Sequence, residues 1–406
     1  MSVLLNIDIS RQFQIAPNTV KNWIDQTLNG KLNFDLIKVG EKHHIRNTPE
    51  NIDLIQRLKH VNARFRPAKK TVAEIEPNSE FYKLFSDRQI IDLIHSIETY
   101  NYIPVKYSYF GNGAQIYFNA IEDELRNPTS ISALEQAQVS EYLVDTVMSF
   151  VRQGFKINLI EIGHDYSTYQ LIDTVKELIK LDAFKSYITV SASEAMNKIR
   201  LEKVRVWTKH VGKSYNLDYE LDSLKEMLFL EKDKKTINIC LALSSCLGNS
   251  AVFTAGFHSL CRNLGNRDFL ILSESLFYEE KYVDNNSKIM VSGLRQERYK
   301  PLLENLNLED LLLQGDIESF GFYSIKSRYN YLKQSIKLKL IVTPSNLYYL
   351  EFKKMEKIYY INLANHKLEN LISIVTNNYL LKNLKIPHHK RVLMLIGARE
   401  NTIKHY

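Results

Sequence analysis

Apolar segments of strand length alternate with amphipathic helical segments across the middle of the chain, and no other feature restricts the fold as strongly. The segments expected to be strands are 157–162, 187–190, 204–206, 237–243 and 269–272. Between them, apolar residues recur at helical spacing, as in 171–179 and in 253–264, where Gly265 is a stop signal. Strands that alternate with helices of this kind predict a parallel, doubly wound sheet. We therefore expect an α/β fold with ligands bound beyond the carboxyl ends of its strands.

The segments on either side predict further elements of the same domain. Helical spacing over 81–97, and from about residue 131 to 151, indicates two helices before the first strand. Residues 338–361 are rich in β-branched residues and tyrosine, which predicts an antiparallel addition to the sheet. With 406 residues, 45% of them hydrophobic, the chain is long enough for two or three domains with sizeable cores.

The cysteines and the lack of long apolar runs indicate the cellular compartment. Cys240, Cys246 and Cys261 lie in apolar segments and do not have the spacing of a metal site. They are expected to be reduced core thiols of a cytoplasmic protein. Because the cysteines lack that spacing, no metal is expected. Neither a signal peptide nor a run of membrane-spanning length is expected from the sequence, so a membrane is not an expected partner.

Residues 1–66 predict a separate domain built on a winged helix-turn-helix. Ile9 and Phe13 indicate a short first helix, and Pro17 starts a second helix at the position where a missing N–H is tolerated. Two apolar runs on either side of residues 40–41 predict a β-hairpin, the wing, and a third helix follows it.

Nearly all of the net charge of the chain is concentrated in residues 1–70, which contain this predicted domain. Residues 1–70 carry twelve Lys and Arg against six Asp and Glu, a net charge of +6, whereas the whole chain carries +7. A basic excess confined to one small domain is typical of phosphate binding. The positions expected to contact double-stranded DNA are polar or basic residues of the second helix and the hairpin, namely Asn18, Thr19, Lys21, Asn22, Lys42, His43 and Arg46.

The arrangement resembles the winged helix-turn-helix of MerR and excisionase-type proteins, and the resemblance implies DNA binding. Winged proteins of this type often pair on DNA as homodimers, although no heptad pattern in this chain enforces pairing. The alternative is a small three-helix module that binds another protein. Residues 67–78, which are polar and contain two prolines, are expected to be a linker, and residues 79–406 to form the second domain.

The loop after the first predicted strand carries an acid-x-Gly pattern. Glu161 ends the strand, and Gly163 allows the backbone to turn close to a ligand. The pattern resembles the first motif of Rossmann-type methyltransferases, acid-x-Gly-x-Gly, which wraps S-adenosylmethionine. Asp165 occupies the place of the second glycine. By itself, the pattern is also compatible with an ordinary strand-to-helix turn.

A wider similarity comes from four segments that occur in one order: 106–113, 128–129, 187–194 and 243–249. Together they resemble the histidine-specific methyltransferase family, which makes trimethylhistidine for ergothioneine. The resemblance covers about residues 80–400 and implies a Rossmann-like class I methyltransferase domain with S-adenosylmethionine as cofactor. It assigns cofactor binding to Glu161, Gly163, Ser191, Ser245 and Gly248. It assigns the alignment of an amine with the donor methyl group to Asn249 and Tyr109.

Three departures from that family concern the cofactor and the substrate. The acid that holds the cofactor ribose is replaced by Ser191, whose hydroxyl cannot chelate a diol as a carboxylate does. The family's Tyr-Tyr pair before the Pro-Thr turn is replaced by Arg126 and Asn127. Around 358–365 there is no matching Glu and Ser for an imidazole. Free histidine is therefore not the expected substrate.

Two functions remain open at this point. The second domain is either an active S-adenosylmethionine-dependent N-methyltransferase, acting on an unknown small-molecule or protein amine and recruited to DNA, or a non-catalytic module. In the second case it binds a ligand or a partner for a transcriptional regulator or assembly factor. Ser191 and Asp165 favour the second function. The residues that favour the first are those that keep the family's pattern, namely Glu161, Gly163, Gly248 and Asn249.

Overall fold

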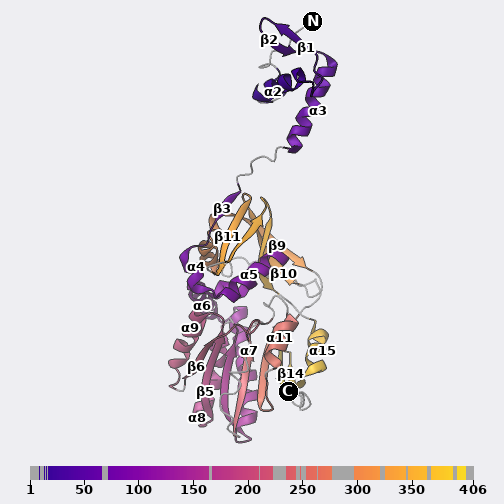
Figure 1. Cartoon of the computed structure of the whole chain (residues 1–406). Coiled ribbons are helices and arrows are strands. Elements are labelled where there is room, and N and C mark those ends of the chain that lie inside the picture. Colours follow the sequence, from indigo (N-terminus) through magenta and orange to yellow (C-terminus); the bar gives the residue numbers. More distant parts are fainter. Residues whose placement is uncertain are drawn as a thin grey trace. The chain divides into compact units, whose positions relative to one another are not determined.

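The structure is a computed structural model in which the chain divides into two compact units, Met1–Thr71, called the head, and Val72–Tyr406, called the body (Figure 1). The residues that it describes are 9, 13, 15, 17–65, 72–163, 167–209, 211–222, 235–243, 247, 253–262, 264–276, 297–320, 325–343, 346–363, 367–386 and 391–398. In these residues, no helix is both long and apolar enough to cross a bilayer.

The described part of the head contains two helices and a hairpin. They are α2 (Pro17–Leu28), β1 (Leu36–Val39), β2 (Lys42–Ile45) and α3 (Pro49–Phe65). In the antiparallel hairpin Val39 lies opposite Lys42, and Gly40 in the turn has a φ of 63°, a conformation that glycine adopts readily. The predicted hairpin is therefore confirmed. The predicted first helix falls mostly outside the described residues, although the Phe13 N–H donates to the Ile9 carbonyl at 3.0 Å, the spacing of a helical turn.

One buried side chain joins the hairpin to α3. Asn51 is 2% exposed, and its Nδ2 donates to the carbonyl oxygens of Asp35 and Arg46, each at 2.9 Å. Its Oδ1 accepts the Asp35 N–H at 3.0 Å. These bonds satisfy backbone groups that the hairpin leaves open, and they hold it over a core that includes Val20 and Trp23.

The centre of the body is a seven-stranded sheet in the order β14-β15-β8-β7-β4-β5-β6. Its strands are β4 (Lys156–Ile162), β5 (Phe184–Ser191), β6 (Val211–Asn216), β7 (Thr236–Ala242), β8 (Asp268–Ser275), β14 (Leu380–Lys385) and β15 (Arg391–Gly397). Strands β4 to β8 are mutually parallel, β15 runs antiparallel to β8, and β14 runs antiparallel to β15. The predicted α/β fold with a mostly parallel, Rossmann-like sheet is therefore confirmed.

Helices cover both faces of this sheet. The helices that pack on it are α7 (Ile131–Val151), α8 (Ile172–Lys180), α9 (Glu194–Arg205), α11 (Phe253–Cys261) and α15 (Leu368–Asn378). Helices α7 and α8 contribute to one buried cluster, and α11 and α15 contribute to the other. As expected, Cys240 and Cys261 are buried free thiols, and burial raises the pKa of both. Cys246 lies outside the described residues.

A second layer of helices and two small sheets completes the body. Its helical elements are α4 (Ser79–Leu84), α5 (Asp87–Tyr100), α6 (Asn112–Leu125), α14 (Lys300–Asn305) and the 3-10 turns η1 (Val105–Tyr109), η2 (Ser167–Leu171) and η4 (Glu309–Leu311). The sheets are β12-β11-β3 and β13-β10-β9. Their strands are β3 (Ala73–Ile75), β9 (Leu312–Phe320), β10 (Ile325–Leu332), β11 (Ile336–Thr343), β12 (Asn346–Phe352) and β13 (Lys357–Leu363). Both sheets share a core with α4, α5, α6 and η1.

Four expectations about these elements were wrong in part. Residues 204–206 are not a strand, because α9 continues to Arg205 and the third parallel strand is β6. Residues 338–361 do not extend the main sheet; they belong to the two small sheets, and β11 buries alternate residues, as a sheet covered on one face does. The predicted linker ends early, because Ala73–Ile75 pair in parallel with β11. The helix expected over 81–97 is two helices, and Ser86 caps the second.

Candidate functional site

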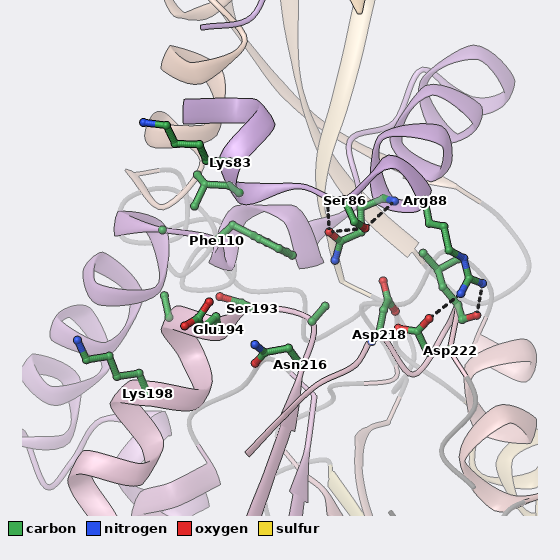
Figure 2. Close-up of a pocket in the computed structure, with 16 residues that line it drawn as sticks. Lys83, Ser86, Arg88, Phe110, Ser193, Glu194, Lys198, Asn216, Asp218 and Asp222 are labelled. Atoms are coloured by element: carbon green, nitrogen blue, oxygen red, sulfur yellow. Dashed lines mark hydrogen bonds and ion pairs between the residues drawn. The ribbon is translucent and has the colours of Figure 1, made fainter. Parts of the chain in front are cut away.

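A pocket of about 480 Å³ lies at the carboxyl ends of β5 and β6, where a doubly wound sheet binds its ligands (Figure 2). The start of α9 and the segment after β6 form one side, and α4, α5 and the residue after η1 form the other. The polar and aromatic residues that line it include Lys83, Ser86, Arg88, Phe110, Ser193, Glu194, Lys198, Asn216, Asp218 and Asp222. In Figure 2, Asn216 lies between Glu194 and the two aspartates.

Behind the aspartate side of the pocket is a buried cluster of one lysine and three acids, which we call the Lys106 cluster. Lys106 is 3% exposed, and its Nζ lies 3.0 Å from Asp92, 2.9 Å from Asp218 and 2.9 Å from Glu220. Burial alone would lower the pKa of Lys106, but the three carboxylates outweigh it and raise the pKa well above its ordinary value. Three carboxylates thus share one ammonium group.

Asp218 connects this cluster to the pocket. Its side chain is 2% exposed, and burial raises its pKa above the ordinary value of an aspartate, although Lys106 acts in the opposite direction. Its backbone N–H donates to Asp222 at 2.9 Å, and Asp222 in turn accepts a 2.8 Å hydrogen bond from Arg88. Arg88 thereby balances Asp222, whereas Asp218 shares its counter-ion with two other acids.

Glu161 belongs to a different buried network, beneath the loop after β4. Its carboxylate is 0% exposed, lies 3.0 Å from Arg200 Nε, and accepts hydrogen bonds from Thr168 and Tyr187. Arg200 also donates to the carbonyl oxygen of Gly163 at 3.0 Å. Gly163 has a φ of 108°, which favours glycine, and its N–H donates to the Val190 carbonyl. The carboxylate therefore fixes the turn from inside the protein.

Ser191 lies at the end of β5 but is not part of the pocket wall. It is 0% exposed, and its Oγ accepts the Ser193 N–H at 3.2 Å. Ser193 does line the pocket; it caps α9 by accepting the Met196 N–H, and its hydroxyl donates to the Tyr109 carbonyl at 2.6 Å. The loop after β5 and the end of η1 are thereby held together.

Tyr109 is buried beside a guanidinium group. It is 1% exposed, its hydroxyl accepts from Arg298 Nη1 at 2.8 Å, and the Arg298 guanidinium carbon lies 4.8 Å from its ring centre and 5.2 Å from that of Tyr117. The other predicted site residues, Ser245, Gly248 and Asn249, lie outside the described residues. Their proximity to Tyr109 therefore stays a prediction.

The residues expected to contact DNA lie on α2, on β2 and, for Arg46, directly after β2 in the head. Asn18, Lys21, Asn22 and Lys42 are exposed, and Thr19, His43 and Arg46 are half-buried. The Nε of Arg46 lies 3.5 Å from Asp35, and this pair must open or be shared if Arg46 binds a phosphate. The positions are accessible, and their role in DNA binding stays a prediction.

The sequence did not identify the acids that border the pocket. Asp218 and Asp222 follow β6, a strand that was assigned to the wrong segment, and Lys106 is separated from Glu220 by 114 positions along the chain. One signal was present: acids at 218 and 220 alternate with other residues directly after a strand, at the edge where ligands bind.

No family model and no curated protein matches this sequence. Among solved structures, the chain is similar to the CMeT domain of citrinin polyketide synthase (TM-score 0.40, 9% identity, 98% of this chain and 81% of that chain). It is also similar to the PH0226 protein of Pyrococcus horikoshii OT3 (TM-score 0.36, 10% identity, 67% and 94%). A third similarity is to the glycopeptide N-methyltransferase MtfA complexed with S-adenosyl-L-homocysteine (TM-score 0.30, 10% identity, 63% and 87%). At these identities and TM-scores, the similarities define neither an activity nor a substrate for this chain.

Proposed function

We propose that the body is an S-adenosylmethionine-dependent N-methyltransferase-like domain and that the head binds double-stranded DNA. The observation that carries the first part is the sheet, in which five parallel strands in the order β8-β7-β4-β5-β6 are extended by the reversed strand β15 and then by β14. This is the strand arrangement of the class I methyltransferase domain that the sequence resemblance implies. The pocket at the carboxyl ends of β5 and β6 supports the same proposal.

The pocket offers groups that suit the adenosine end of the cofactor. The carboxylate that Ser191 cannot supply after β5 is available from the next strand, because Asp218 and Asp222 follow β6 and line the pocket. Carboxylate oxygens accept hydrogen bonds from a ribose diol or an adenine amino group. Phe110 adds an aromatic side chain to the same pocket. We propose that Glu161 supports this site indirectly, by holding the Gly163 turn through Arg200.

The methyl group of a bound sulfonium is already activated, so the chain must mainly align it with an amine. Tyr109 is placed for a positioning role, because Arg298 holds its hydroxyl and Ser193 bonds its carbonyl. We propose that Tyr109 and Asn249 align the acceptor, and that Ser245 and Gly248 complete the cofactor site.

Calorimetric titration of the full chain with S-adenosylmethionine and S-adenosylhomocysteine tests the cofactor site. We expect saturable binding with a dissociation constant on the order of micromolar. The variant Asp123→Asn, at an exposed acid that pairs with Arg126 on α6 and does not line the pocket, should bind as the wild type does. Absence of binding at millimolar cofactor would rule out the methyltransferase proposal.

The alternative, a non-catalytic ligand-binding module of a regulator, is favoured by Ser191 and by Asp165 in the glycine motif. The two functions separate in one assay, in which labelled S-adenosylmethionine is incubated with the full chain and amine-bearing acceptors. Methyl transfer supports the enzyme. Cofactor binding without transfer to any amine supports the module.

The proposal for the head is supported by its net charge and by the exposure of Lys21 and Lys42 on the helix and the hairpin. We expect double-stranded DNA binding to weaken with salt, and each lost phosphate contact to reduce the slope of log affinity against log salt by about 0.9. Lys21→Ala and Lys42→Ala should each reduce this slope. Lys180→Ala, on the exposed surface of α8, should leave the slope unchanged. An unchanged slope in both head variants would contradict the proposed DNA interface.

A further inference from the structure

Arg328 is a buried arginine in the middle of β10, the central strand of the β13-β10-β9 sheet. It is 5% exposed, and its Nε is inaccessible to solvent and has no hydrogen-bond acceptor. Within the described ranges of the chain, none of its side-chain nitrogens has a hydrogen bond or an ion pair. A buried guanidinium is costly unless a negative charge or several acceptors compensate it.

The other buried arginines among the described residues of the body each have at least one hydrogen-bond or ion-pair partner. Arg200 pairs with Glu161, Arg298 donates to Tyr109, and Arg391 donates to Ser273 Oγ at 3.1 Å. Arg328 is therefore distinguished from residues of the same type and similar burial in the same unit.

The face of the sheet that carries Arg328 is directed toward the core of the body. Its neighbours across the strands are Tyr360 and Ile317, and both pack in the cluster that contains η1 and α6. Tyr360 lies on the same face as Asn330, to which its hydroxyl donates at 2.8 Å. The acid next to Ile317, Glu318, bonds Lys357 and Tyr359 on the opposite face, so it does not compensate Arg328.

The backbone is irregular on both sides of this residue. Along β13, Ser327 lies opposite Asn362 whereas Arg328 lies opposite Tyr360, and along β9 the register shifts again between Arg328 and Asn330. Such β-bulges re-aim individual side chains and are common next to binding sites. Two of them flank Arg328, which among the buried arginines of the described residues is the one without a side-chain partner.

We propose that Arg328 binds an oxyanion, a carboxylate or phosphate group of a ligand of the body. The planar guanidinium presents paired donors that match either group, which an ammonium does not. The aromatic side chains next to it extend toward a second guanidinium, because Tyr360 contacts Tyr299 with ring centres 5.1 Å apart and Arg298 lies over the Tyr299 ring. The inference does not depend on methyl transfer.

The test is the thermal unfolding of the full chain in sodium acetate, sodium phosphate and sodium chloride at equal ionic strength. The wild type should show a saturable rise of about 2–4 °C in one oxyanion relative to chloride, at concentrations well above the dissociation constant. Acetate and phosphate distinguish a carboxylate site from a phosphate site. Because phosphate also stabilises proteins without a site, the quantity of interest is the difference between wild type and Arg328→Met.

Arg328→Met should lose the oxyanion-specific rise, and Arg328→Lys, which keeps the charge without the planar fork, should need about tenfold more anion. Arg126→Met, an exposed arginine of the same unit, should respond as the wild type does. If Arg328→Met does not fold, the anion concentration that Arg328→Lys needs for the same rise tests the proposal in its place. The same rise in all variants, or no saturable rise in the wild type, overturns the proposal. Titration with S-adenosylhomocysteine in the same samples tests the cofactor site separately.

Discussion

Two buried ionic networks lie near the carboxyl edge of the main sheet, and they differ in the balance of charge. Among the described residues, Glu161 forms an ion pair with Arg200, and both are 0% exposed. In the Lys106 cluster, three carboxylates lie within 3.0 Å of one ammonium. A balanced buried pair mainly fixes a conformation. An excess of one charge beside a pocket instead leaves an electrostatic potential that a bound ligand can compensate. We therefore assign a structural role alone to the first network, and a role in ligand binding as well as in stability to the second. Single substitutions can test that assignment.

The largest expected effect is that of Lys106→Met on stability. The change leaves three buried carboxylates without their shared counter-ion, and we expect a loss of about 3–5 kcal/mol in the free energy of unfolding. Urea unfolding followed by circular dichroism measures it. Lys180→Met, at an exposed lysine of α8, is the control and should change stability by less than about 0.5 kcal/mol. A loss below about 1 kcal/mol at Lys106 would show that the cluster carries less charge than its geometry implies.

The second effect concerns the balanced pair. Glu161→Gln leaves Arg200 buried without a carboxylate, and we expect a loss of about 3 kcal/mol in the free energy of unfolding. Glu177→Gln, at a half-exposed acid on α8, provides the comparison. Because Gln retains an acceptor for Thr168, the loss reports the charge more than the hydrogen bonds. An equally stable Glu161→Gln would contradict the structural role of this carboxylate.

The two networks also show which parts of the site could be predicted from the sequence. The strands β4 and β7 were predictable, as residues 157–162 and 237–243, because strands buried on both faces are mostly apolar. The edge strand Val211–Asn216 contains Gly212, Lys213 and Ser214, which have no such pattern. Acid-x-Gly at Glu161 is a local motif. That its carboxylate faces Arg200 depends on tertiary packing, which local patterns do not encode.

The third prediction separates binding from stability. If the pocket holds the cofactor, Asp218→Asn should weaken S-adenosylhomocysteine binding about tenfold, or about 1.4 kcal/mol, because an acceptor oxygen becomes an amide donor. Glu161→Gln should weaken the affinity less, by about threefold, since its carboxylate is 0% exposed and acts on the site only through the turn that Arg200 holds. Calorimetry on both variants, with Asp123→Asn as the control, measures this. The opposite pattern would place the ligand at Glu161 and exchange the roles of the two networks.

The smallest expected effect is that of Asp218→Asn on stability, and it depends on pH. Burial raises the pKa of Asp218 in the folded protein above its unfolded value of about 3.9. As the pH rises from the unfolded pKa to the folded pKa of Asp218, this aspartate loses its proton first in the unfolded chain. The wild type therefore loses stability over this interval, and the Asn variant does not. The variant should therefore gain stability relative to the wild type as the pH rises above the unfolded pKa, and the gain should be small because the remaining acids still share Lys106. Unfolding free energies of both proteins across this range measure the gain. A variant that instead becomes relatively less stable toward neutral pH would mean that Lys106 requires all three carboxylates, and that the cluster is as balanced as the Glu161 pair.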